Sequence, residues 1–199
     1  MNAESEPEQE PLSPNDFTIY NRLAEKMSHI HAEFRNTWTT LKTACSQPSH
    51  SSTPQSRNPD QDADCIMDDT SLILLTLSFI SSLSNHHSIE ENYIFPTLAT
   101  RMPEFSPSGV LMGQHGVIHD GLVRIRSYLR GCERFMDGEL DEEGRGEKLN
   151  REKLRGMLMG EDGEFERVLW EHLDREVEFL EAERMRKCWR VEEVRRLPM

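Results

Sequence analysis

The chain has 199 residues, of which 36% are hydrophobic and 30% are charged, and its formal net charge is −13. This length favours one domain with a hydrophobic core. The acidic excess argues against a surface that binds nucleic acid or an anionic membrane, since both need clustered Lys and Arg. No apolar stretch of the sequence is long enough to cross a membrane.

The first fourteen residues, MNAESEPEQEPLSP, are rich in Glu and Pro and are predicted to form a disordered acidic tail, residues 1–14. They contain neither the basic region nor the apolar region of a secretory signal, which favours a cytoplasmic protein. The chain has four cysteines without a CxxC pair, so we expect reduced thiols, as is usual in the cytosol.

Apolar residues at three- and four-residue spacing predict a first helix from about Asp16 to Thr43. The Ser- and Pro-rich segment that follows, residues 46–64, lacks this spacing and is expected to be a mobile loop. A second helix starts at Asp68 or Asp69, either of which could cap it. We expect Pro96 to bend or shorten this helix, because proline has no backbone N–H to donate.

The turn MPEFSPSG leads to a third predicted helix at about 108–135. A charged loop, GELDEEGRGEK at 138–148, precedes the last helical region at about 150–187. Within that region, Gly160 and Gly163 mark a break in the helical pattern.

No segment has the alternating pattern of a strand, so the sequence predicts an all-α fold. Four amphipathic helices in one domain of this size indicate an antiparallel four-helix bundle, which would occupy residues 15–187. Residues 188–199 would form a C-terminal extension.

Histidines lie on the predicted apolar faces of all four helices, and two of these faces also carry a glutamate four residues later. These residues are His31 on the first helix, His86 and Glu90 on the second, His115 and His119 on the third, and His172 and Glu176 on the fourth. Residues four apart lie above one another on a helix, so each pair would point inward together.

Burying these groups without a partner would destabilise the fold. An uncompensated ionised carboxylate costs several kcal/mol, against a total stability of about 5–15 kcal/mol. A divalent metal removes this cost, because neutral imidazole and anionic carboxylate are ligands that it prefers. Seven ligands exceed the four of a single tetrahedral zinc, so the set favours two adjacent metals with bridging carboxylates.

Some of these signals have simpler explanations when each is taken alone. A single inward histidine such as His31 is more often a hydrogen-bonded core residue than a ligand. His86 and Glu90 could form a surface helix pair worth a few tenths of a kcal/mol. Histidines on four helices of one predicted bundle favour a metal centre over these explanations.

The sequence allows two roles for His87 and Glu91 on the second helix. His87 and Glu91 flank the stripe formed by His86 and Glu90, so they are either alternative ligands or groups that orient the ligands. The segment HGVIH at 115–119 lacks the glutamate of the HExxH motif, which excludes a zinc protease of that kind.

The stretches HHSIEENYIFP, QHGVIHDGL and LWEHLDREVEFL, and more loosely MSHIHAEFRNTW, resemble the hemerythrin-like (HHE cation-binding) family over roughly residues 16–183. The resemblance implies a four-helix bundle around a non-haem di-iron centre with an open position for dioxygen. An oxo or hydroxo group could bridge the two iron ions.

The resemblance also implies a distribution of ligands between the two irons. One iron would be held by His115, His119 and His172, the other by His31 and His86, with Glu90 and Glu176 as bridges. Hemerythrin itself has an aspartate five residues after its last histidine, whereas Glu176 follows His172 by four residues. This departure weakens the case for a stable, reversible oxygen carrier.

The expected function is therefore that of a di-iron protein that binds or reacts with dioxygen or a related small oxidant, as a carrier, a sensor or a low-turnover oxidase. One alternative is an iron- or oxygen-responsive regulatory or interaction module without catalysis. Another is an enzyme of specialised metabolism that uses the histidines as acids and bases on an organic substrate. Whether the protein is an enzyme stays open, as do its protein partners, while no nucleic-acid or membrane partner is expected.

Overall fold

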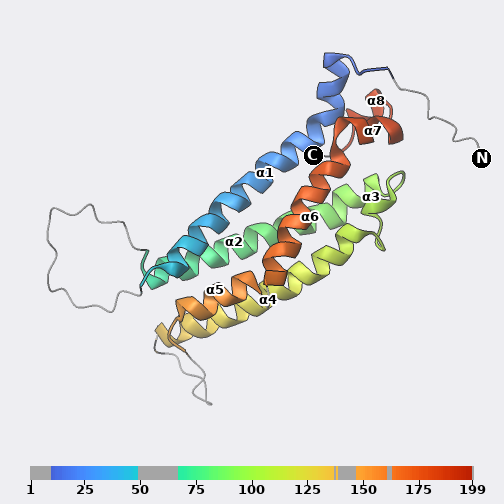
Figure 1. The fold of residues 1–199 in the computed structure, drawn as a ribbon. Coiled ribbons are helices and arrows are strands. Elements are labelled where there is room, and N and C mark those ends of the chain that lie inside the picture. The colour runs from blue at the N-terminus through green and yellow to red at the C-terminus, as the bar shows by residue number, and fades with distance from the viewer. Residues whose placement is uncertain (1–9, 49–66, 137, 139–146, 161–162, 199) are drawn as a thin grey trace, which may run out of the picture.

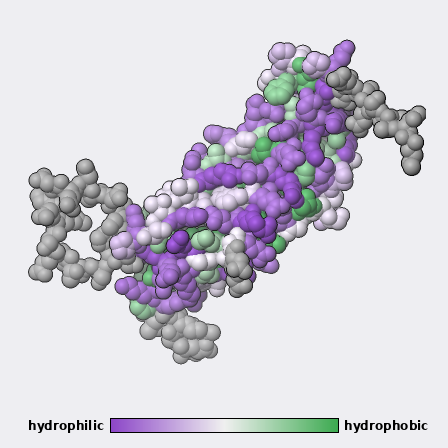
Figure 2. Space-filling model, in the orientation of Figure 1, coloured by the Kyte–Doolittle hydropathy of each residue, from purple (hydrophilic) through white to green (hydrophobic). Residues whose placement is uncertain are grey.

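The fold is described from a computed structural model, which covers residues 10–48, 67–136, 138, 147–160 and 163–198. All regular structure in these ranges is helical, which confirms the predicted all-α class (Figure 1). None of the helices in this part of the chain combines the length and the apolar character that a membrane span requires. The face seen in Figure 2 is mainly hydrophilic, with apolar side chains in small separate areas.

Three predicted segments fall wholly or partly outside the described residues. The acidic tail at 1–14 is described only from residue 10, and the loop at 46–64 only to residue 48. Most of the charged loop at 138–148 also lies outside the described part of the chain.

The first helix, α1 (Pro14–Ser46), confirms the predicted helix and extends it at both ends. The Ser13 side chain caps it by accepting a hydrogen bond from the backbone N–H of Asp16, and Pro14 occupies the first turn, where no N–H is needed. Its buried side chains recur every three or four residues and include Leu23, Met27, Phe34, Trp38 and Leu41.

The second helix, α2 (Asp69–Ile89), begins after Asp68, whose side chain accepts a hydrogen bond from the backbone N–H of Ser71. It continues into a π-helical turn, η1 (Glu90–Ile94), in which the N–H of Phe95 donates to the carbonyl of Glu90, and then into α3 (Phe95–Leu98). The π turn comes just before Pro96, whose ring excludes an ordinary hydrogen bond to the carbonyl four residues earlier. Helical structure therefore persists for only one short turn past Pro96.

The rest of the chain forms a short turn, η2 (Pro103–Phe105), and then α4 (Val110–Met136), α5 (Arg151–Met159), α6 (Glu164–Leu180), α7 (Ala182–Cys188) and α8 (Val191–Val194). The predicted break in the last region is confirmed, because Gly160 and Gly163 both have positive φ angles, 78° and 75°. The predicted extension at 188–199 is partly helical, since it contains α8.

Four long segments cross the molecule between two apolar clusters. α1 packs against α2 and α6, and α4 packs against the same two helices (Figure 1). Along α1 and α4 the chain passes from the cluster that contains Leu111 to the cluster that contains Leu129. Along α2 with η1 and α3, and along α6, it passes in the opposite direction. Between the two clusters lies one buried layer of histidines and glutamates, contributed by all four segments.

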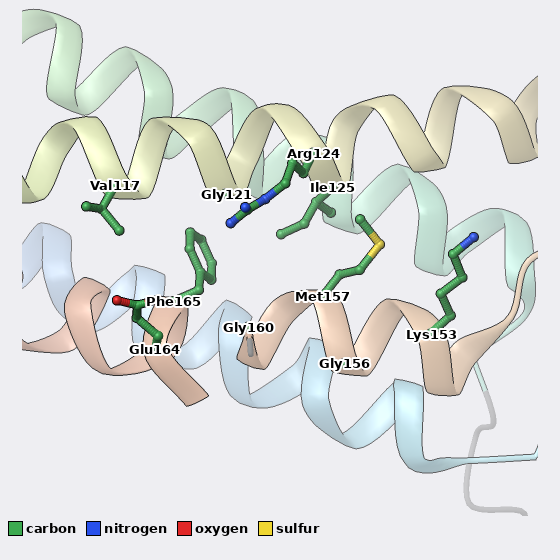
Figure 3. Close-up of a pocket in the computed structure, with 10 residues that line it drawn as sticks. All are labelled: Val117, Gly121, Arg124, Ile125, Lys153, Gly156, Met157, Gly160, Glu164 and Phe165. Carbon is green, nitrogen blue, oxygen red and sulfur yellow. The ribbon is translucent and has the colours of Figure 1, made fainter. Parts of the chain in front are cut away.

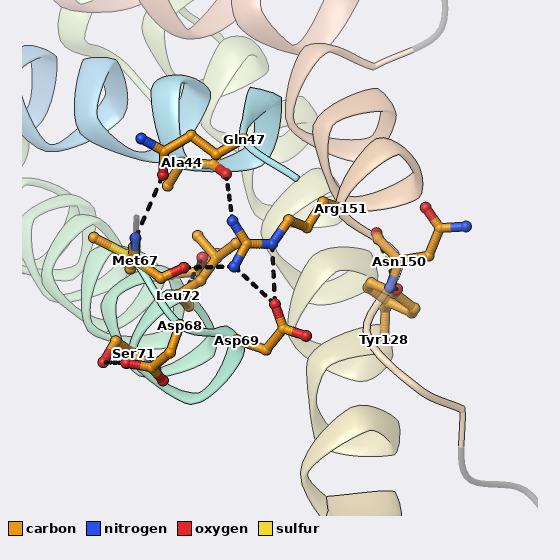
Figure 4. Close-up of polar contacts among 11 residues, drawn as sticks. Ala44, Gln47, Met67, Asp68, Asp69, Ser71, Leu72, Tyr128, Asn150 and Arg151 are labelled. Atoms are coloured by element: carbon orange, nitrogen blue, oxygen red, sulfur yellow. Dashed lines mark hydrogen bonds and ion pairs between the residues drawn. The ribbon is translucent and has the colours of Figure 1, made fainter. Parts of the chain in front are cut away.

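A buried arginine joins the ends of three helices, α1, α2 and α5 (Figure 4). Arg151, only 5% exposed, opens α5 and donates from Nε and Nη2 to one carboxylate oxygen of Asp69, at 2.9 and 2.8 Å. Its Nη1 donates to the carbonyl of Ala44, and its Nη2 donates also to the carbonyl of Met67. These bonds hold the end of α1 and the start of α2 against α5.

Candidate metal centre

The buried polar layer consists of five histidines and two glutamates. They are His31 from α1, His86 and His87 from α2, Glu90 from η1, His115 from α4, and His172 and Glu176 from α6. Each is at most 8% exposed, and Glu90, His172 and Glu176 are fully buried. Buried polar groups of this kind are normally satisfied by hydrogen bonds or by a cation. The contacts of each group therefore indicate whether the layer could bind a metal.

Glu90 occupies the centre of the layer. Its Oε1 lies 2.7 Å from Nε2 of His86, and its Oε2 lies 3.3 Å from Nε2 of His115. Despite these short distances, neither oxygen accepts a hydrogen bond of acceptable geometry from the described residues. The two oxygens of one carboxylate thus face histidines on two different sides.

The layer divides into two groups that share Glu90. We call them the His31 group, which is His31, His86, Glu90 and Glu176, and the His87 group, which is His87, Glu90, His115 and His172. Within each group, one ligand atom from every residue lies within 4.8 Å of the others. Either group could therefore hold a metal ion, since imidazole nitrogen and carboxylate oxygen are the ligands of many divalent cations.

Histidine nitrogens converge inside both groups. Nε2 of His31 lies 3.2 Å from Nε2 of His86, and Nε2 of His115 lies 3.0 Å from Nε2 of His172. Two neutral imidazole nitrogens at such a distance either share one proton or direct their lone pairs at a common cation. The second arrangement also satisfies the carboxylates, because both oxygens of Glu176 lack a hydrogen-bond donor among the described residues.

Burial favours the neutral form of three of the imidazoles, which is the form that binds a metal. It lowers the pKa of His86, and it lowers the pKa of His87 still further together with the neighbouring histidines. For His172, burial lowers the pKa to about 3, although the negative charge of Glu176 opposes this change.

The pKa values of the two buried glutamates are shifted in opposite directions. Burial, and then the nearby charge of Glu176, raise the pKa of Glu90 well above its ordinary value. Burial also opposes ionisation of Glu176, but its close contact with His31 and the nearby His172 outweigh it, so the pKa of Glu176 is lowered. The protein groups alone therefore do not favour two ionised carboxylates, whereas a cation between them would.

The prediction that His119 faces inward with His115 is wrong. The side chain of His119 is 70% exposed and lies 3.7 Å from Asp120, outside both groups. The buried stripe of α4 continues from His115 to Ile118 and Leu122. At about 100° per residue, His119 is rotated by roughly 100° from Ile118 toward solvent.

His87 takes part in the layer instead. Its ring is 6% exposed and stacks on the ring of His115, with centroids 4.0 Å apart. A signal for this was present in the sequence, because α2 buries adjacent pairs at seven-residue spacing. The pairs are Leu72 with Ile73, Phe79 with Ile80, and His86 with His87. Such doubled positions indicate a helix with neighbours on two sides, here α1 and α4.

Glu91 is placed beside the layer rather than in it. Its side chain is 38% exposed, and its Oε1 lies 2.7 Å from Nδ1 of His115. Of the two interpretations that the sequence left for Glu91, the geometry matches a group that orients a histidine. Glu176 belongs only to the His31 group, so Glu90 is the carboxylate that the two groups share.

Another hollow of the surface lies away from the buried layer. A cavity of about 390 Å³ lies between α4 and the break from α5 to α6, where Phe165 points toward Gly121 (Figure 3). None of the seven buried histidines and glutamates lines it. A smaller cavity of about 220 Å³, between α1 and α6, does reach the layer, because His31 is one of its walls.

No family model, no curated protein and no solved structure matches the chain.

Proposed function

We propose that the protein is a hemerythrin-like four-helix bundle with a non-haem di-iron centre, and that it binds or reacts with dioxygen or a related small oxidant. The observation that carries the proposal is the position of Glu90, whose two oxygens face His86 of one group and His115 of the other. A carboxylate shared by two ligand sets is what a pair of adjacent metals requires.

The bundle is supported by the packing of the long helices. Each of α1 and α4 contacts both α2 and α6, and the four segments alternate in direction between the two apolar clusters. This arrangement is typical of antiparallel bundles whose metal sites are built from side chains on facing helices.

The ligand set that we propose differs from the one implied by the family resemblance. His87, His115 and His172 would hold one iron together with Glu90, and His31, His86 and Glu176 would hold the other with the same Glu90. His119 is not included, since its side chain is exposed. Glu90 would be the bridge, and Glu176 would bind on one side.

Iron is favoured by the chemistry of the donors. The groups contain imidazole and carboxylate but no thiolate, which disfavours metals that need soft ligands. Each group offers four protein ligands, so an iron with octahedral preference would keep positions for small molecules. Iron would supply one-electron redox steps, and the protein would supply a site shielded from bulk water.

The burial of the layer favours a small oxidant over an organic substrate. Its side chains are at most 8% exposed, so a large molecule has no direct contact with them. The pKa of His172, about 3, is also far below the value near 7 that suits a general base at neutral pH. These two features argue against a specialised-metabolism enzyme that uses the histidines as acids and bases.

The test is to load metal-free protein with Fe²⁺ without oxygen, remove unbound iron, and measure iron per chain and the visible spectrum before and after oxygen. We expect two irons per chain, one for each group, and new absorption after oxygen. Absorption that reverses on removing oxygen would indicate a carrier, and slow multiple turnover would indicate an oxidase. Protein that retains no iron under these conditions would refute the proposal.

A further inference from the structure

A metal that binds in the buried layer must cross the helices that cover it. The cavity of about 220 Å³ between α1 and α6 lies on such a path. One of its walls is His31, which is 3% exposed and belongs to the His31 group. The same side chain therefore borders both the cavity and the proposed metal position.

His31 also keeps an unused polar atom. Its Nε2 lies 3.3 Å from Oε2 of Glu176, on the side of the metal group. Its Nδ1 is buried and has no hydrogen-bond partner among the described residues. Histidines that bind a metal usually donate their second N–H to a partner, and a water molecule in the adjoining cavity is suited to this role.

Small residues of α1 leave the space beside His31 open. Ser28 and Ala32 line the cavity one helical turn apart, whereas the longer side chain of Arg35 reaches across to Asp174 of α6. Across the cavity, α6 contributes Leu173 and Val177. The path is thus narrow and suited to an ion rather than to a bulky molecule.

The outer part of the cavity is negatively charged. Three carboxylates line it, from Asp174, Glu178 and Glu181, against one guanidinium, from Arg35. Arg35 is paired with Asp174 through a short contact between Nη2 and Oδ1. Glu178 and Glu181 add two further negative charges.

These two glutamates lie where the α6 helix itself is negative. Glu178 is in the last turn of α6 and Glu181 is its C-cap residue, and this turn contains no basic residue. The C-terminal end of a helix carries partial negative charge, so Glu178 is unfavourable for α6, whereas Glu181 is also the N-cap residue of α7, where a negative charge is favourable. The position of Glu178 is explained if this end of α6 attracts a cation.

We propose that the seam between α1 and α6, from Glu178 and Glu181 past Ala32 to His31, is the route by which divalent metal ions enter and leave the buried centre. The inference rests on the proposed function, because it requires that a metal binds there. The glutamates concentrate the cation at the surface, Ala32 leaves room for it to pass, and His31 is the first ligand that it meets.

The rate of metal uptake tests the route, with Co²⁺ as the probe, since its visible bands report ligation by histidine and carboxylate. Metal-free full-length protein is mixed with Co²⁺ in a stopped-flow instrument. Ala32→Leu fills the cavity without removing a ligand, and Thr40→Leu, at another exposed position of α1, is its matched control. We expect Ala32→Leu to slow both uptake and release of Co²⁺ several-fold while the final amount bound stays the same, and Thr40→Leu to behave as the wild type.

Charge is tested separately with the double variant Glu178→Gln/Glu181→Gln. The control is Glu133→Gln/Glu152→Gln, which removes the same charge at positions that do not line the cavity. We expect the first pair to slow uptake by about tenfold at low ionic strength and to approach the wild-type rate in high salt, because screening removes electrostatic attraction. The control pair should change the rate little.

The possible outcomes test the entry route and the proposed metal centre independently. A wild type that binds no Co²⁺ and no Fe²⁺ would refute the metal centre itself. A wild type that binds metal, with both seam variants loading at the rates of their controls, would refute only the route. If Ala32→Leu slowed the reaction of the loaded protein with oxygen but not metal uptake, the seam would be a path for the oxidant, and our proposal would be overturned.

Discussion

The Glu91 carboxylate accepts a hydrogen bond from Nδ1 of His115 at 2.7 Å. Because an ionised carboxylate can only accept, Nδ1 of His115 is the donor, and in a neutral imidazole this leaves Nε2 with a free lone pair. That nitrogen lies 3.3 Å from Glu90 and 3.0 Å from Nε2 of His172, inside the His87 group. Glu91, although partly exposed, thus orients His115 so that Nε2 can bind a metal.

Removing this support should weaken metal binding without abolishing it. Glu91→Ala leaves His115 in place but frees its tautomer, so we expect metal affinity to fall by about 10- to 100-fold. Glu91→Gln should have a smaller effect, since its amide oxygen can still accept the hydrogen bond. Competition with a chelator of known affinity measures the change. Equal loss in the two variants would show that the negative charge, rather than the hydrogen bond, is what matters.

Alanine substitution of His87 and of His119 should have different effects on the amount of metal bound. His87→Ala removes a buried member of the His87 group, so it should reduce the metal bound per chain by about as much as His86→Ala. His119→Ala changes a side chain that is 70% exposed and should leave metal content unchanged. Metal analysis of the three variants under one loading protocol decides the matter. A loss in His119→Ala with normal binding in His87→Ala would restore the ligand set implied by the family resemblance.

The raised pKa of Glu90 predicts a pH-dependent stability of the metal-free protein. A carboxyl group whose pKa is higher in the folded state than in the unfolded state, where it is about 4.3, stabilises the fold fully below that value. This stabilisation is lost as the pH rises through the folded-state pKa. Glu90→Gln removes the titration, so its stability relative to the wild type should increase as the pH rises from about 4 toward neutral.

Urea unfolding of both metal-free proteins at several pH values measures this difference. The comparison with the variant cancels the contribution of the buried histidines, which acts in the opposite direction. A stability difference that does not change with pH would mean that the pKa of Glu90 is the same in the folded and unfolded states, which would contradict this prediction. The same variant should also bind less metal than Glu91→Gln, because it loses the shared anionic ligand.

Metal should stabilise the folded protein. A ligand that binds only the folded state adds RT ln(1 + [L]/Kd), which is about 4 kcal/mol at a thousandfold excess over Kd. Adding a chelator to loaded protein should therefore lower Tm clearly, and restoring Fe²⁺ should raise it again. Differential scanning calorimetry checks this. An unchanged Tm would contradict the view that the buried carboxylates need a cation.

The hydrogen bonds of Arg151 should contribute to the free energy of unfolding but not to the amount of metal bound. Arg151→Met removes the partner of Asp69 and leaves the carbonyls of Ala44 and Met67 without a donor, so we expect a loss of about 3 kcal/mol. Arg151→Lys, which keeps the charge but not the forked geometry, should lose less. Urea unfolding gives the loss, and metal content should match the wild type. A loss of metal in Arg151→Met would show that this end of the molecule is coupled to the layer.

The sequence by itself determined the helices and most of the polar layer. The cap at Asp68 and the break at Gly160 and Gly163 could be predicted, because caps and left-handed glycines act on neighbouring backbone groups. The inward direction of His31 and His172 could also be predicted, since each continues a stripe of apolar residues along its own helix.

Only the tertiary structure decided which residue lies just inside a buried stripe and which lies just outside it. His87 and His119 each border a stripe, but α2 is covered on two sides by α1 and α4, which buries His87, while His119 lies on an uncovered side of α4. That Glu90 is shared between the two groups, and Glu176 is not, likewise depends on distances across four segments far apart in the chain. Periodicity determines the direction of a side chain relative to its own helix, whereas burial and shared contacts depend on where the neighbouring helices pack.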